Sequence, residues 1–253
     1  MRGLRAAVAF LTRIPVGAAA VERDDLKRSV PFFPLVGGLL GLAVAGVYAA
    51  ARTILPSFGA AVLAIGVGVG LTGGLHEDGL GDTADALGGR SREEALGILK
   101  DPAHGTYGVL AISIGLLLRV GALSGLDGWS ALSVLPAAHA LSRGGTMVLL
   151  GVMKPATEEG LGASYADEVS SKRLVAAIFL AVAIGLTALG LWVAPACLLA
   201  AGAAWAMGRF ALRKIGGLTG DVLGAAQQAA ETLILLLGGA VVTRGWPGLP
   251  WWR

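Results

Sequence analysis

The sequence has few of the residues that mark a soluble or a disulfide-bonded protein. Cysteine occurs once, at Cys197, which excludes a disulfide framework and a cysteine-based zinc site. Charged residues make up 15% of the 253 positions, compared with about 25% in an ordinary soluble domain. With 10 prolines and no glycine at every third position, the chain is not collagen-like. Because 55% of its residues are hydrophobic, disorder is excluded as well, and a polytopic integral membrane protein remains.

Long apolar segments recur along the chain. A helix needs about 20 apolar residues to cross the hydrocarbon core of a bilayer. Residues 1–253 therefore predict a single all-α membrane domain with about seven (six to seven) transmembrane helices. The fifth and sixth form a tight hairpin or one broken helix, and the seventh begins with polar residues. The predicted spans are Phe32–Ala51, Phe58–Leu75, Gly108–Leu126, Ala131–Gly151, Leu174–Ala194, Pro195–Leu212 and Val222–Val242.

Residues 1–30 precede the first predicted span and carry six basic side chains. The part from Met1 to Val16 mixes three arginines with apolar residues and contains Pro15. This pattern predicts an amphipathic helix at the membrane surface rather than a cleavable signal peptide.

The charged residues are distributed unevenly about the predicted spans. Fifteen of the 20 Lys and Arg residues lie in segments on one side, and three lie on the other. The positive-inside rule therefore places the N-terminus in the cytoplasm and the C-terminus outside. Sixteen of the 17 acidic residues lie on the same side, with Asp127 as the exception. We expect the active site on the cytoplasmic face.

The densest acidic stretch lies in residues 76–107, which we interpret as a cytoplasmic catalytic loop. Asp78, Asp82 and Asp85 stand at positions i, i+4 and i+7, so a helix would place the three carboxylates on one stripe. Like charges at this spacing repel each other, and carboxylate oxygens without a cysteine partner favour a hard cation such as Mg²⁺ or Mn²⁺. The alternative is a solvated acidic helix face, which the scarcity of charge in this chain disfavours.

Polar residues also precede the third predicted span, between Lys100 and Gly108. Gly105 and Gly108 allow a ligand to approach the backbone closely. Lys100 is suited to pairing with a phosphate and Asp101 with a metal ion. A charged cap on a transmembrane helix is the other explanation of this segment.

A second polar cluster opens the last predicted span. Gly216–Ala229 aligns with Gly73–Ala86 at seven of 14 positions, which raises the hypothesis of an internal duplication. The alignment pairs Asp221 with Asp78 and makes Asp221 a further candidate metal ligand. Ionisable residues inside the spans are energetically costly and are therefore candidates for function. The alternative for the two arginines is snorkelling to the membrane surface, and the alternative for the histidine is a hydrogen-bonded residue of the core. These candidates are Arg119, His139, Arg143 and Glu231.

Together these residues resemble the motifs of a known family, the cobalamin synthases (adenosylcobinamide-GDP ribazoletransferases). The resemblance runs in family order from about residue 10 to residue 231. The sequence departs from the family after Asp101, where Ser and a basic residue are often found. If a basic side chain contacts phosphate there, either Lys100, Arg90 or His104 takes its part or the contact is dispensable. The matching motifs are Phe10–Val16, Pro34–Gly37, Gly73–Asp85, Lys100–Leu110 and Leu218–Ala225.

The resemblance implies a membrane-bound, Mg²⁺-dependent transferase of cobalamin biosynthesis in the bacterial cytoplasmic (inner) membrane. Its substrates would be adenosylcobinamide-GDP and α-ribazole or α-ribazole 5′-phosphate, and its products adenosylcobalamin or its 5′-phosphate, with GMP. The residues expected at the site are Asp78, Asp82, Asp85 and Asp221 as metal ligands, His76, Lys100 and Asp101 in catalysis, and Gly105, Thr106, Gly108, Arg143 and Thr219 in substrate binding.

Two other functions stay open at this point. One is another Mg²⁺-dependent membrane phosphotransferase or prenyltransferase, acting on a CDP-alcohol or a polyprenyl diphosphate. The other is a cation transporter, which predicts carboxylates near the bilayer midplane rather than at one face. No long basic patch with interleaved aromatic residues occurs, so nucleic-acid binding is not expected. The lipid bilayer is the expected environment, and a homo-oligomer is compatible with the sequence.

Overall fold

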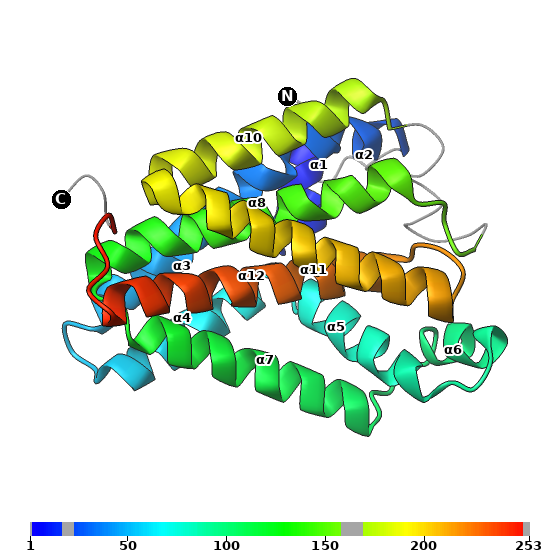
Figure 1. The fold of residues 1–253 in the computed structure, drawn as a ribbon, viewed down its shortest axis with the longest axis horizontal. Coiled ribbons are helices and arrows are strands. Elements are labelled where there is room, and N and C mark those ends of the chain that lie inside the picture. The colour runs from blue at the N-terminus through cyan, green and yellow to red at the C-terminus, as the bar shows by residue number, and fades with distance from the viewer. Residues whose placement is uncertain (1, 17–22, 158–168, 250–253) are drawn as a thin grey trace.

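The computed structural model describes residues 2–16, 23–157 and 169–249, so Met1 and residues 17–22 of the predicted interfacial segment lie outside it. The described residues form helices and no β-strand, apart from one isolated bridge between Pro155 and Leu218. The predicted all-α fold is confirmed (Figure 1). The helices are α1 (Arg2–Leu11), α2 (Arg23–Ser29), α3 (Phe33–Ala51), α4 (Ser57–Thr72), α5 (Leu75–Asp85), α6 (Arg92–Ile98), α7 (Thr106–Ser124), α8 (Gly128–Val152), α10 (Ser171–Leu189), α11 (Val193–Lys214) and α12 (Gly220–Thr243).

Four segments are long and apolar enough to cross a membrane, and a fifth is added if the bent pair α4–α5 is one span. The four are Asp25–Ala51, Thr106–Ser124, Ser171–Lys214 and Gly220–Thr243. The third has 44 residues, about twice the length of a single crossing. Figure 1 shows its two helices, α10 and α11, running in opposite directions from the turn at Gly190–Trp192, so this part is a hairpin. The chain is a multi-pass membrane protein, and seven crossings stay a prediction.

Helix α8 lies among α3, α10, α11 and α12 and packs against all four. Helix α3 approaches it closely through Gly37 and Gly41. An added Cβ would lie 2.6 Å from the Arg143 side chain at the first glycine and 2.5 Å from the Leu135 carbonyl oxygen at the second. Small residues four positions apart are typical of tightly packed membrane helices. The surrounding helices thereby bury the polar side chains of α8, which are Ser130, Ser133, His139, Ser142, Arg143 and Thr146.

The N-terminal helix α1 forms where the sequence predicts an amphipathic helix. Its small and apolar side chains Ala6, Ala7 and Leu11 are buried against the rest of the protein. Helix α1 contacts α2 and α3, so its apolar face is covered by protein at these positions. Its placement at the membrane surface stays a prediction.

The polar elements gather at one end of the bundle. Figure 1 shows α6, the start of α7 and the end of α11 at the end opposite the C-terminus. Helix α4 ends in two consecutive glycines with left-handed backbone, Gly73 at φ 67° and Gly74 at φ 71°. Only glycine adopts this conformation without strain, and the chain turns by 89° between α4 and α5. The turn carries α5 between α7 and α12, both of which it contacts.

Helix α5 crosses α12 at Gly79 and Gly224. An added Cβ at Gly79 would lie 2.8 Å from the carbonyl oxygen of Asp221 and 3.3 Å from the Cα of Gly224. Backbone therefore meets backbone at the crossing. The contact brings the first turn of α12, with Asp221, to the acidic helix.

We expect Gly79→Ala to lower the free energy of unfolding by about 1–3 kcal/mol, because the backbone of α12 must move to accommodate the methyl group. Thermal unfolding in detergent micelles measures this loss. The control is Gly66→Ala in α4, where an added Cβ has no atom within 4 Å and the stability stays within about 1 kcal/mol of wild type. Equal losses in the two variants would contradict the close crossing.

Candidate functional site

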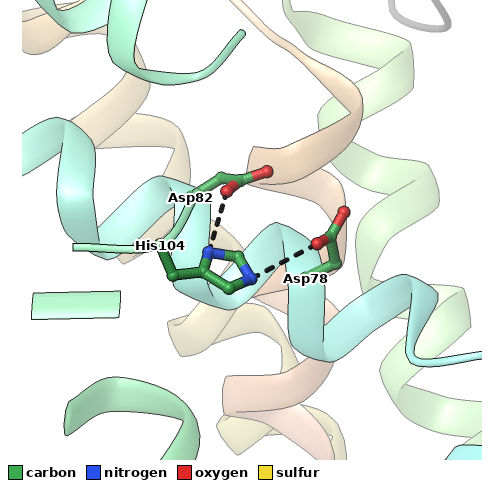
Figure 2. Close-up of side chains that lie close together, drawn as sticks. All are labelled: Asp78, Asp82 and His104. Carbon is green, nitrogen blue, oxygen red and sulfur yellow. Dashed lines mark ion pairs between the residues drawn. The ribbon is translucent and has the colours of Figure 1, made fainter. Parts of the chain in front are cut away.

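Asp78 and Asp82 lie one turn apart on α5, and His104 lies between them (Figure 2). The His104 Nε2 is 3.4 Å from the Asp78 Oδ1, and the His104 Nδ1 is 3.2 Å from the Asp82 Oδ1. Each residue offers one ligand atom, and these three atoms lie within 4.8 Å of one another. The three donors can therefore converge on one cation.

His104 reaches the acidic helix because α5 has a glycine at the contact. An added Cβ at Gly81 would lie 2.9 Å from the His104 Cε1 and 2.8 Å from the Ile112 Cδ1. The imidazole occupies the space that a larger side chain would fill. The sequence indicated His104 only as one of three replacements for a phosphate contact, so its place beside the aspartates was not predicted.

The two carboxylates differ in their surroundings. The Asp78 side chain is 66% exposed, whereas the Asp82 side chain is 13% exposed. Helix α5 lies outside the four apolar segments. Burial, and then the nearby carboxylates of Asp78 and Asp221, raise the pKa of Asp82 to about 6, while His104 lowers it. The carboxylates repel one another when they are all ionised, and a divalent cation would offset this repulsion.

This donor set fits the expected magnesium ion. Mg²⁺ is commonly held by one or two carboxylates and keeps open positions for substrate phosphates. Asp78 and Asp82 supply those carboxylates, and Asp221 at the start of α12 is close enough to influence the pKa of Asp82. The imidazole of His104 is a less usual ligand for Mg²⁺ or Mn²⁺, which prefer carboxylate, carbonyl and water oxygens.

Asp85, the third aspartate of the predicted stripe, has other partners. Its Oδ2 accepts a hydrogen bond of 2.7 Å from the Gly105 N–H, and its Oδ1 accepts one of 2.9 Å from the Gly108 N–H. These N–H groups belong to the start of α7, where helical partners are missing. Added Cβ atoms at both glycines would collide with the Asp85 carboxylate. Asp85, Gly105 and Gly108 thus form a hydrogen-bonded contact between the end of α5 and the start of α7. Their ligand-binding roles stay predictions.

The remaining predicted polar residues make local contacts. Lys100 and Thr106 are exposed, and the Asp101 Oδ1 accepts a 3.0 Å hydrogen bond from the Ala103 N–H in the turn after α6. The Thr219 Oγ1 accepts a 3.3 Å hydrogen bond from the N–H of the third residue of α12 and caps that helix. The structure leaves the catalytic and binding roles of these four residues as predictions.

Glu77 of α5 and the ionisable residues of the predicted spans form a buried network between α5, α7, α8 and α12. The Arg119 Nη1 is 3.0 Å from the Glu77 Oε1 and 3.5 Å from the Glu231 Oε1. The Glu231 Oε2 is 3.7 Å from the Arg143 Nη1 and 3.4 Å from the His139 Nδ1. Both arginines are at least 97% buried, which excludes snorkelling for either.

Two cavities adjoin Asp78. The outer cavity has a volume of about 570 Å³ and is lined by polar residues that include Arg13, Glu77 and His104. The inner cavity has a volume of about 110 Å³ and lies between α1, α3, α5, α8 and α12. Phe10, Leu75 and Asp78 line both cavities.

His76, a predicted catalytic residue, is buried and lines the inner cavity. Arg143, a predicted substrate-binding residue, lines the same cavity from α8. Arg13 in the outer cavity was not predicted as a site residue, although it lies within the N-terminal motif Phe10–Val16 that matches the family.

The family model of cobalamin-5-phosphate synthase matches residues 3–239, which include α5, His104 and the lining of both cavities. The chain belongs to the cobalamin synthase family. This result confirms the resemblance inferred from the sequence motifs.

Curated relatives of this cobalamin synthase family member carry the name adenosylcobinamide-GDP ribazoletransferase. The protein from Azorhizobium caulinodans is 43% identical over 248 residues, covering 91% of this chain and 92% of its own length. The protein from Bradyrhizobium diazoefficiens is 40% identical over 246 residues, covering 94% and 93%. The protein from Ralstonia nicotianae is 39% identical over 243 residues, covering 92% and 93%. No solved structure shows a significant match.

We expect Mg²⁺ to raise the thermal unfolding temperature of the protein, since an ion that binds only the folded state stabilises it by about 2.7 kcal/mol at 100 times its dissociation constant. The shift should disappear in Asp82→Asn, which removes a charged ligand. It should persist in Asp85→Asn, because the Asp85 oxygens serve the start of α7. Loss of the shift in Asp85→Asn alone would place the metal elsewhere on α5.

Proposed function

We propose that the protein is a membrane-bound, Mg²⁺-dependent adenosylcobinamide-GDP ribazoletransferase. It joins adenosylcobinamide-GDP to α-ribazole or α-ribazole 5′-phosphate and yields adenosylcobalamin or its 5′-phosphate, with GMP. Family membership and relatives of about 40% identity over most of the chain support the activity.

The observation that carries the proposal is the grouping of Asp78, Asp82 and His104, of which Asp78 and His104 line the outer cavity together with Arg13. Phosphoryl transfer depends mainly on positioning and on neutralising negative charge. A pair of carboxylates that can hold a cation and an arginine that can pair with phosphate oxygens supply both means of neutralisation. The outer cavity therefore suits the diphosphate of adenosylcobinamide-GDP.

In the proposed reaction, a ribose hydroxyl of the acceptor attacks the phosphorus bonded to the aminopropanol arm of cobinamide. A new P–O bond forms, the bond to the GMP phosphate breaks, and GMP leaves with its electron pair. The Mg²⁺ ion, when bound, neutralises charge on the diphosphate. Asp78 and Asp82 hold the ion, and Arg13 orients the diphosphate. The hydroxyl proton passes to a spare carboxylate or to His76.

We propose the bacterial cytoplasmic membrane as the location, with the N-terminus and the acidic end of the bundle in the cytoplasm. The excess of Lys and Arg on that side supports this orientation. The hairpin α10–α11 exposes large apolar side chains to its surroundings, as a lipid-facing surface does. They include Phe179, Leu198 and Trp205. A homo-oligomer stays compatible with this arrangement.

The two alternative functions are less well supported. A phosphotransferase or prenyltransferase for other diphosphates would share the metal site, but the family match covers nearly the whole chain. A cation transporter requires charged groups along a pathway, whereas Glu77 and Glu231 are paired with arginines.

We expect Asp82→Asn to reduce GMP release from adenosylcobinamide-GDP and α-ribazole by roughly 100-fold or more, because it removes a charge that holds the metal. The assay uses purified protein in lipid nanodiscs with Mg²⁺. Glu93→Gln, on the exposed α6, is the matched control and keeps wild-type activity. Wild-type activity of Asp82→Asn would refute the metal site, and no release by the wild-type protein would refute the proposed reaction.

A further inference from the structure

Part of the inner cavity is lined by aromatic and apolar side chains, as a pocket for an apolar ring is. Its wall at the N-terminal side contains Phe10 and Phe33, whose rings stack with centroids 5.5 Å apart and planes inclined by 7°. Met147 and Leu150 of α8 and Leu223 of α12 supply further apolar surface. The polar residues of the lining come from α5, α8 and α12, and they are His76, Asp78, Arg143, Thr146, Asp221 and Gln227.

The volume of the cavity limits what it can hold. About 110 Å³ is well below the ~300–1,000 Å³ of pockets that enclose a whole drug-sized ligand. The cavity is therefore too small for a corrinoid or a complete nucleotide, but a single bicyclic aromatic ring fits this scale. Of the two substrates in the proposed reaction, the ribazole offers such a ring, because it is a ribonucleoside of a substituted benzimidazole.

Two buried polar residues of the cavity have hydrogen-bonding atoms without partners. The Arg143 Nε and the Gln227 Oε1 have no hydrogen-bond partner among the described residues, although both side chains are at least 98% buried. An unpaired buried donor or acceptor costs about 1–3 kcal/mol, which a ligand with matching groups recovers. A benzimidazole nucleoside has a ring nitrogen that accepts a hydrogen bond and ribose hydroxyls that donate one.

The position of the cavity also suits an acceptor. Asp78 and Leu75 line both cavities, so the inner cavity opens at the acidic helix where the outer one begins. A nucleoside whose base lies among Phe10, Phe33 and Met147 would present its ribose toward Asp78 and Asp221. The hydroxyl would then face a diphosphate in the outer cavity.

We propose that the inner cavity is the acceptor subsite, which binds the benzimidazole ring of α-ribazole between α1, α3, α8 and α12. Arg143 and Gln227, which line the cavity, supply polar groups for its recognition. This inference rests on the proposed function, and it assigns the two substrates to separate cavities that meet at Asp78.

The test fills the subsite with a larger side chain. Leu223→Trp places an indole at the cavity wall, so the KM for α-ribazole should rise at least about tenfold, which corresponds to a binding loss of about 1.4 kcal/mol. The KM for adenosylcobinamide-GDP and the Mg²⁺-dependent thermal shift should stay at wild-type values. Leu117→Trp, on the exposed side of α7, is the control and leaves both constants unchanged.

A binding measurement supplies a second readout that does not need turnover. Equilibrium dialysis of radiolabelled α-ribazole against the solubilised protein, without the corrinoid substrate, should show binding to wild type and at least tenfold weaker binding to Phe10→Ala. This variant removes a ring from the wall, so it tests the subsite even where Leu223→Trp does not fold.

The outcomes separate the two proposals. Wild-type turnover with an unchanged KM for α-ribazole in a folded Leu223→Trp, or with unchanged α-ribazole binding in Phe10→Ala, would overturn the acceptor subsite and leave the proposed function standing. A wild-type protein that releases no GMP would overturn the proposed function itself.

Discussion

The structure depends on the pairing of Glu231 with Arg119 and Arg143 inside an apolar bundle. Each of these charges would be very costly alone in a medium without water, and removing one partner of a buried pair typically costs about 3–5 kcal/mol. Because Arg119 also binds Glu77, the network connects α12 to α7, α8 and α5. It thereby fixes the rotation of these helices. Glu77 joins this network, while Asp78 on the same helix lines the outer cavity and both Asp78 and Asp82 contact His104.

The long apolar helices and the acidic stripe could be predicted because both follow from helical periodicity and hydropathy. Asp78 and Asp82 share a face because they are one turn apart in any helix. The same rule grouped Asp85 with them, but α5 ends at Asp85 and the N–H groups of α7 bind its oxygens. Local spacing contains no information about where the start of another helix will lie.

His104 and the two cavities could not be predicted for a similar reason. The position of His104 depends on the path of an irregular segment after α6 and on the missing side chain at Gly81. The inner cavity is assembled from α1, α3, α5, α8 and α12, which are far apart in the sequence. The sequence did indicate Arg143 and Glu231 as candidates for function, because charged residues are rare in this chain. It left open whether their side chains reach water or pair with each other.

The two glycine motifs that align in the sequence also correspond in the structure. Gly73 and Gly216 both adopt left-handed backbone after a long helix, at φ 67° and 76°, and the side chain of an arginine lies against each, Arg13 and Arg92 respectively. Each motif then leads into a helix with an aspartate in its first turn, and these helices, α5 and α12, cross at glycine. The candidate site therefore lies where two short segments of similar sequence and similar backbone meet, and an internal duplication of these segments stays a hypothesis. A fragment that carries only the first motif keeps the residues that line the outer cavity, but it lacks Asp221 and the α12 wall of the inner cavity.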